Sequence, residues 1–278
     1  MKYLRLRATS TCTDRGAIAR HGHAILALTL LLATTCLPTQ AAPDPVTLGQ
    51  AFSFGVLAGS TVTNTGPSVV FGNVGVSPGT AITGFPPGTI VGGTERVNDS
   101  LAQQAQLDLT TAYNIIEGET FDVDLTGQDL GGLILQTGVY NFDTSAQLTG
   151  NLILDAQNNP NARFDFQIGS TLTTESSSSV TVINGGSVNN VFFQVGSSAT
   201  LGTGTLFQGN ILALTSITLT TGATIPGGRA LARNGAVTLD TNTIGAAAVI
   251  PEPSAAVLLG CAGLPMGIVF LRRRKRDK

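Results

Sequence analysis

The sequence predicts a mainly β fold, a solenoid of stacked coils with one helix alongside, and two observations carry this prediction. The tetrad T-L-x-T recurs down the second half of the chain, and successive central leucines are 24, 29, 18 and 20 residues apart. A fixed motif at roughly 20-residue spacing in a glycine-rich, β-prone chain is typical of a solenoid. One stretch, residues 97–117, has a helical period instead. The central leucines are Leu148 (in a weaker first copy), Leu172, Leu201, Leu219 and Leu239.

Each copy of the tetrad is expected to lie on a strand, one coil above the next. Side chains alternate along a strand, so the leucine points into the core and the flanking threonines point outward. At the strand spacing of a sheet, about 4.8 Å, these threonines form a ladder of hydroxyl and methyl groups on one flat face. Any function of the chain has to be compatible with that ladder.

A second repeated segment precedes the tetrads. Residues 164–170 and 191–197 are near-copies of the form Φ-x-F-Q-Φ-G-S, where Φ is apolar, and residues 207–213 and 229–233 occupy the same slot in later coils. We expect an aromatic and aliphatic strand before each threonine strand, with the phenylalanines stacked inside the solenoid. The glutamines are expected to pair with turn backbone, and a glycan-stacking role for the Phe-Gln pairs is the alternative.

The remaining elements follow in order along the chain. Residues 46–91 read as short strands punctuated by proline and glycine turns. Apolar residues from Val97 to Ile116 then form one stripe of an amphipathic helix. Asn98, Asp99 or Ser100 is expected to cap its start, and Gly118 to stop it. From residue 125 to residue 244 the pattern is β again.

The two ends of the chain read as processing signals. A basic stretch, an apolar run of about a dozen residues and a small-residue cleavage site make residues 1–42 a secretory signal peptide, the run being short of the ~20 residues of a membrane span. The other end carries Pro251-Glu252-Pro253, an apolar stretch over 254–271 and a basic cluster over 272–276. This tripartite tail resembles the PEP-CTERM sorting signal, and a plain stop-transfer anchor is the alternative.

The resemblance of the tail implies a route of export. It implies a Gram-negative bacterium, recognition by an exosortase, and frequent association with exopolysaccharide. It also implies transient anchoring in the inner membrane through residues 254–271, which the basic cluster keeps oriented towards the cytoplasm. The mature protein is then secreted or held at the cell surface, and its domain spans residues 43–250.

Composition excludes several function classes for residues 43–250. This segment has no Cys, His, Lys, Met or Trp, so we expect no enzyme activity, no catalytic residue, no cofactor and no metal site. Its four arginines stand against 14 acidic residues, a net charge of −10, which argues against binding nucleic acid. Asp122, Asp124 and Asp129 form one acidic cluster, which we interpret as a solvated strand edge or a weak calcium site.

The ordered motifs of residues 46–245 resemble the DUF3494 family of microbial ice-binding proteins. They include Leu48-Gly49, residues 72–78 followed by 81–85, the single long helix, Gly138-Val139-Tyr140, the Phe-Gln segments and residues 228–232. The resemblance implies a right-handed discontinuous β-solenoid of triangular section. It also implies one helix packed along a side, and N- and C-terminal coils that are neighbours in the stack.

The resemblance further implies that a loose T-A/G-x-T/N pattern on one flat face binds ice, an extracellular role in which the protein inhibits recrystallisation. Thr221-Gly222-Ala223-Thr224 matches the pattern fully, and other coils depart from it, one by replacing threonine with serine. The alternative is a structural or adhesive protein of the exopolysaccharide matrix on the same scaffold. The expected ice-binding residues are Thr65, Ser68, Ser178, Thr203, Thr205, Thr221, Thr224, Thr241 and Thr243.

Overall fold

The computed structural model of this protein describes residues 46–245. The predicted signal peptide over 1–42 and the predicted sorting tail over 251–278 lie outside the described residues. Within 46–245, no helix is long and apolar enough to cross a membrane.

Three parallel sheets form the three sides of the solenoid, because each coil contributes one short strand to each sheet in turn. Sheet A, in spatial order, contains β7 (Glu95–Val97), β4 (Asn73–Val76), β1 (Phe54–Ala58), β22 (Arg229–Ala232), β19 (Asn210–Ala213), β16 (Val191–Val195), β13 (Phe164–Ile168), β10 (Gly138–Phe142) and β8 (Val123–Asp124). Sheet B contains β11 (Ala146–Leu148), β14 (Leu172–Thr174), β17 (Ala199–Leu201), β20 (Ile217–Leu219), β23 (Val237–Asp240), β2 (Thr61–Thr65) and β5 (Ala81–Thr83). Sheet C contains β6 (Thr89–Val91), β3 (Val69–Phe71), β24 (Thr243–Ile244), β21 (Thr224–Ile225), β18 (Leu206–Phe207), β15 (Ser179–Ile183), β12 (Asn151–Asp155) and β9 (Ile134–Leu135).

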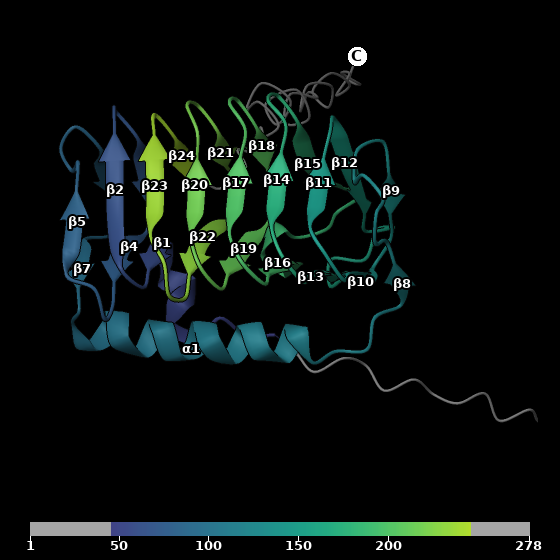
Figure 1. Cartoon of the computed structure of the whole chain (residues 1–278), viewed down its shortest axis with the longest axis horizontal. Helices are drawn as coiled ribbons and strands as arrows, with labels where there is room; N and C mark the ends of the chain where they lie inside the picture. The colour runs from purple at the N-terminus through teal and green to yellow at the C-terminus, as the bar shows by residue number, and fades with distance from the viewer. Residues whose placement is uncertain (1–45, 246–278) are drawn as a thin grey trace, which may run out of the picture. The chain divides into compact units, whose positions relative to one another are not determined.

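The order of coils in the stack differs from their order in the chain. The chain enters the stack at β1 to β3, builds one end with β4 to β7, and crosses to the other end through the helix α1 (Ser100–Glu117). Strands β8 to β24 then return coil by coil until β22, β23 and β24 pair with β1, β2 and β3. The expectation that the N- and C-terminal coils are neighbours is therefore confirmed (Figure 1).

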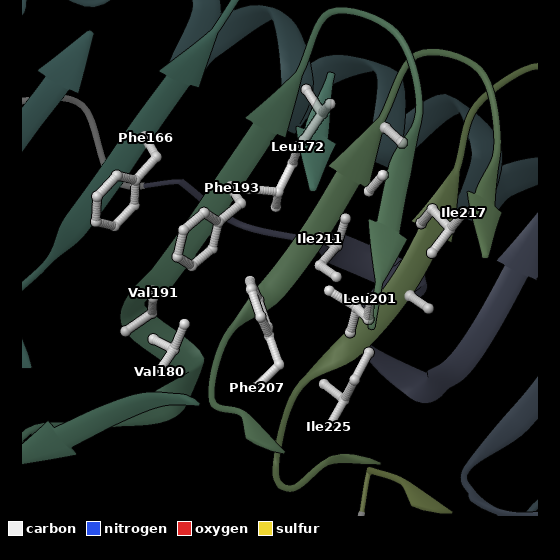
Figure 2. Packing of buried hydrophobic residues seen from close by; sticks show 14 of the residues in the cluster. Phe166, Leu172, Val180, Val191, Phe193, Leu201, Phe207, Ile211, Ile217 and Ile225 are labelled. Carbon is white, nitrogen blue, oxygen red and sulfur yellow. The ribbon is translucent and has the colours of Figure 1, made fainter. Parts of the chain in front are cut away.

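Stacked aromatic rings run through the interior, as the repeated Phe-Gln segments predict. Phe166 and Phe193 occupy the same position on β13 and β16, and their ring centroids are 4.3 Å apart with planes 3° from parallel. Phe207 continues the stack on one side at 4.7 Å and 56° (Figure 2). Tyr140 extends it on the other side at 5.3 Å. Phe207 is tilted because it comes from sheet C, whereas its neighbours come from sheet A. Offset and tilted aromatic pairs of this kind stabilise a core beyond their area burial.

The helix α1 covers the outer face of sheet A. Its buried side chains, three of them alanines close to sheet A, pack against outward residues of that sheet such as Leu57, Phe192 and Leu231. Sheet A is consequently buried on both faces, and its central strands contain only buried residues. Sheets B and C are left as the solvent-facing sides of the solenoid.

Both ends of α1 are capped by side chains. Asp99 is the N-cap and accepts a hydrogen bond from the Ala102 amide at 2.8 Å, so one of the three predicted caps is confirmed. Val97 lies on β7 with its side chain exposed, and the helix therefore begins three residues later than predicted. At the other end Gly118 is the C-cap, and Gln167 Nε2 donates to the carbonyls of Ile116 (2.6 Å) and Glu119 (2.8 Å). The predicted pairing of this glutamine with backbone is confirmed.

Candidate functional site

Sheet B presents a continuous column of threonines to solvent. Inward and outward residues alternate along its strands, and each of six consecutive strands has an outward threonine at the same paired position. Strand pairing places each of these side chains directly opposite the next. We call this column the threonine ladder; its members are Thr173, Thr200, Thr218, Thr238, Thr63 and Thr83. Gln147 extends it by one strand beyond Thr173.

Three tetrads contribute to the ladder in the same register, and the tetrad at 171–174 is shifted relative to them. Leu201, Leu219 and Leu239 lie in one buried column, and the threonine before each leucine belongs to the ladder. In the tetrad at 171–174, Leu172 lies instead opposite Ala199, so the ladder residue is Thr173, which follows the leucine. The tetrad of this coil is shifted by two residues, so the motif gaps are 24 and 29 although the paired positions Leu148–Thr174 and Thr173–Thr200 are 26 and 27 residues apart. A shift of two keeps every side chain on its own face.

The face around the ladder carries few charges. Two residues before each ladder position the outward residue is serine, threonine or alanine, and Thr171 Oγ1 donates to Ser145 Oγ at 2.8 Å along that column. Charges appear two residues after the ladder, at Glu175 and Asp240, and at one end of its column, where Asp129 lies opposite Gln147. The Asp240 carboxylate accepts hydrogen bonds from the hydroxyls of Thr221 and Thr241, so it is engaged within the protein. The charged groups therefore lie along the margin of the face.

Three of the predicted site residues are wrong, because their side chains are inside the solenoid. Ser68, Ser178 and Thr205 are 0%, 1% and 1% exposed. They lie in one inward column with Ala223 and Asn242, one residue before the strands of sheet C. Their hydroxyls hold the turns: Ser178 Oγ donates to the Glu175 carbonyl at 2.6 Å, and Thr205 Oγ1 donates to the same carbonyl at 3.1 Å.

The other six predicted residues lie along the corner where each coil turns from sheet B to sheet C. Thr224 and Thr243 are opposite one another at the start of β21 and β24, but the same column continues with the apolar Leu206 and Val69. The corner therefore carries an interrupted row of hydroxyls, and the flat, regular array is the ladder on sheet B. A contact between these six residues and ice stays a prediction. Of the other four, Thr65 ends β2 and three lie in the turns, namely Thr203, Thr221 and Thr241.

Two members of the ladder lie outside the tetrads but have a strand signal in the sequence. Thr63 follows Thr61-Val62, and Thr83 follows Ala81-Ile82, so both have the alternation of a half-buried strand. Neither belongs to a T-L-x-T tetrad, because the residue after Thr63 is Asn64, which lies opposite Leu239, and the residue after Thr83 is Gly84. Their place beside Thr238 depends on the docking of the N-terminal coils onto the last coil.

The acidic cluster of the sequence is dispersed in the structure. Asp122 accepts from the Val139 amide at 2.9 Å, and Asp124 accepts from the Thr126 amide at 2.9 Å. Asp129 accepts from the amides of Gly131 and Thr149 at 2.6 and 2.9 Å and from the Thr149 hydroxyl at 2.6 Å. Burial alone would raise the pKa of its carboxyl, but these hydrogen bonds, that from the hydroxyl first, lower it. Among residues 46–245 no group of three metal-ligating side chains comes together. These carboxylates accept hydrogen bonds from backbone amides at the β8 end of the stack, which fits the solvated-edge interpretation.

This fold and this face define a class of protein, a helix-buttressed parallel β-solenoid that presents one flat array of hydroxyl groups. The chain belongs to the ice-binding-like family, whose model matches residues 56–245. An ice-binding protein of Nostoc sp. (strain HG1) is 58% identical over 82% of this chain and 87% of its own length. One from Colwellia sp. is 33% identical over 74% of this chain and 85% of its own length.

Solved structures agree with this assignment. The crystal structure of an ice-binding protein from an Antarctic biological consortium matches with a TM-score of 0.70 and 48% sequence identity, over 76% of this chain and 95% of that chain. That of an ice-binding protein from the ascomycete Antarctomyces psychrotrophicus matches with a TM-score of 0.69 and 44% identity, over 72% of this chain and 97% of that chain. The predicted family and fold class are confirmed.

Proposed function

We propose that this protein binds ice, and that the threonine ladder of sheet B is the centre of the binding surface. The observation that carries the site is the unbroken run of six outward threonines on one parallel sheet. Sheet A is covered by α1 and cannot meet a crystal surface. The relatives named above are ice-binding proteins, which supports the same role for this chain.

The chemistry of the ladder suits a ligand made only of ordered water. Ice has no net charge and no shape to fill a pocket, so affinity has to come from many weak, regularly placed contacts. Strands spaced about 4.8 Å apart repeat the hydroxyl and methyl groups of threonine at a fixed interval. A β-branched side chain has few rotamers to lose when its hydration water becomes ordered. Charged groups would hold their own hydration shells, and on this face they are confined to the margin.

Incorporation into a slowly growing ice hemisphere tests the function directly. The protein should be enriched in the ice fraction, whereas a protein of similar size without ice affinity should be excluded. A parallel measurement of partition onto purified exopolysaccharide covers the alternative of a matrix protein. Exclusion from ice together with retention by the glycan would overturn the proposed function in favour of that alternative.

The ends of the chain suggest where the protein acts. Removal of residues 1–42, exosortase recognition of Pro251-Glu252-Pro253 and release from the membrane segment at 254–271 would deliver domain 43–250 to the cell surface or medium. An extracellular location is where a non-catalytic ice-binding protein meets its ligand. Intact-mass analysis of the native protein from surface and medium fractions should show loss of both ends. Recovery solely from the inner membrane with Lys278 retained would contradict this route.

A further inference from the structure

A pocket of about 370 Å³ opens at the corner where sheet C turns into sheet A, away from sheet B. Its walls combine the partly exposed rings of Phe52 and Phe71 with the backbone of several glycines. None of the described side chains that line it is acidic, although the domain as a whole is strongly so. Among these described lining residues, the one charged group is the guanidinium of Arg229.

Arg229 is a buried cation that has no acidic partner among residues 46–245. Its side chain is 9% exposed, and its Nε donates to the Phe52 carbonyl at 2.9 Å. Its Nη1 donates to the side-chain oxygens of Asn189 (3.0 Å) and Asn210 (2.9 Å). All three acceptors are neutral, and within residues 46–245 Arg229 forms no ion pair. By contrast, Arg96 and Arg163 each pair with a carboxylate.

One nitrogen of the guanidinium remains available to an anion. The Phe52 ring lies over it at 3.8 Å, so one face is covered and the edge is left for hydrogen bonding. Nη2 makes no hydrogen bond to any residue of 46–245, although Nε and Nη1 are both engaged. Burial lowers the pKa of Arg229 to about 10, and the group is therefore still charged at neutral pH. A desolvated charge of this kind is stabilised most by an opposite charge that also hydrogen-bonds to it.

We propose that this pocket is a carboxylate-binding site in which the Nη2 group of Arg229 donates to the anion. A carboxylate oxygen accepts a charge-assisted hydrogen bond from a single guanidinium nitrogen, and the flanking aromatic rings suit a ring-bearing ligand such as a uronate sugar. The same chemistry has a second source in the chain itself. Gly245 lines the pocket, and Glu252 follows seven residues later in the sequence. Binding here is independent of ice binding, because the pocket and sheet B lie on different sides of the solenoid.

Titration of the isotopically labelled full chain with sodium acetate tests the site. Acetate should shift the Arg229 Nε–Hε signal and the amide signals of Gly72, Gly92 and Gly228 in a saturable way, with a dissociation constant on the order of millimolar. Acetamide, which has the same shape without the charge, should leave these signals unchanged. The same titration of Glu252→Gln separates the sources: saturation in this variant alone identifies the chain's own carboxylate as the occupant.

Substitution of Arg229 would also remove its three hydrogen bonds to Phe52, Asn189 and Asn210. A matched pair of variants at another lining residue therefore tests the site with Arg229 intact. Gly92 lines the pocket with φ at +69°, and a Cβ atom added there would meet no atom within 4 Å. Asn and Asp both tolerate this conformation. Gly92→Asp should weaken acetate binding roughly tenfold by competing for the cation, and Gly92→Asn should not. The proposal is overturned by equal responses to acetate and acetamide, or by no saturable response in either the unmodified chain or Glu252→Gln.

Discussion

Thr63 and Thr238 lie directly opposite one another on the neighbouring parallel strands β2 and β23, although most of the described chain separates them. Thr63 belongs to the first coil and Thr238 to the last. The threonine ladder therefore runs through the junction of the two ends of the domain, and Thr63 and Thr83 join it when that junction forms. An intact junction is a condition for the full binding surface.

Bulk in the middle of the ladder should abolish activity without unfolding the domain. In Thr218→Tyr a ring would project from the flat face and separate it from the ice lattice. We expect inhibition of recrystallisation to fall by at least an order of magnitude. The free energy of unfolding should change by about 1 kcal/mol or less, as is usual for a surface substitution. Splat-cooling assays and thermal denaturation measure the two quantities.

Two controls locate the effect of Thr218→Tyr. Thr181→Tyr places the same ring on sheet C, where Val180 is the inward neighbour, and should leave activity unchanged. Thr224→Tyr places it at the corner between sheets B and C and should have an intermediate effect. Loss of activity in Thr224→Tyr with full activity in Thr218→Tyr would move the binding surface from the ladder to the corner.

The aromatic stack should dominate the stability of the central coils. Phe193 is fully buried between Phe166 and Phe207, and Phe193→Ala leaves a cavity that the rigid coils cannot close. We expect a loss of about 3–5 kcal/mol in the free energy of unfolding. Phe121→Ala removes a ring that is 47% exposed and should cost much less. Comparable losses from the two variants, measured by chemical denaturation, would contradict this account.

Stability should decline as the pH rises through neutrality, because of Asp165. Burial raises the pKa of this carboxyl to about 7, against the opposing pull of Arg163, whose Nε lies 2.6 Å from Oδ2. The nearby carboxyl of Glu119 also raises it. The folded state thus keeps a proton that the unfolded chain releases near pH 3.8. The stabilising contribution is complete below about pH 4 and is lost as the pH passes through 7, a change on the order of a few kcal/mol.

Asp165→Asn removes this titration and keeps the shape of the side chain. Its unfolding free energy should be nearly flat between pH 5 and pH 8, whereas that of the unmodified protein should fall. The carboxyls of Asp124, Asp129 and Asp155, whose pKa values are lowered by hydrogen bonds, act below this window and do not mask it. A fall of equal size in both proteins would assign the pH dependence to other groups.

Chelation of metal ions should leave ice binding unchanged. The ladder consists of hydroxyl and methyl groups, and the Asp122, Asp124 and Asp129 carboxylates are each engaged by backbone amides. Ice shaping by protein treated with EDTA and by untreated protein should be equal. A loss that calcium restores would direct attention to the coil end where these carboxylates lie.

The sequence predicted those features that depend on local periodicity. The stripe of α1, the inward leucines and the aromatic stack follow from side-chain alternation and a 3.6-residue period, and the structure contains all three. The placement of Ser68, Ser178 and Thr205 failed for a different reason. Whether a residue of a turn points inward depends on how many residues the turn contains, and the coils differ in that number. The residue pattern alone could not show that Thr205 lies one position before the residue that pairs with Thr224.

The long-range features required more than the repeat. Thr173 aligns with Thr200 although it occupies a different position in its tetrad, because strand pairing follows the stacked aromatic segments upstream. The entry of Thr63 and Thr83 into the ladder follows from the order of coils, which the family resemblance implied and residue spacing did not. Pairing between sequence-distant strands is a property of the whole stack.

The helix α1 also limits how many coils the domain can hold. Its 18 residues are about 27 Å long at 1.5 Å per residue. Sheet A contains nine strands, and at about 4.8 Å per step it is about 38 Å from first strand to last. The helix and its two connections have to bridge that distance, so the length of this crossover limits the number of strands between β7 and β8. An engineered extra coil would need a crossover longer by about three helical residues, and lengthening the ladder therefore requires two coordinated insertions at distant points in the gene.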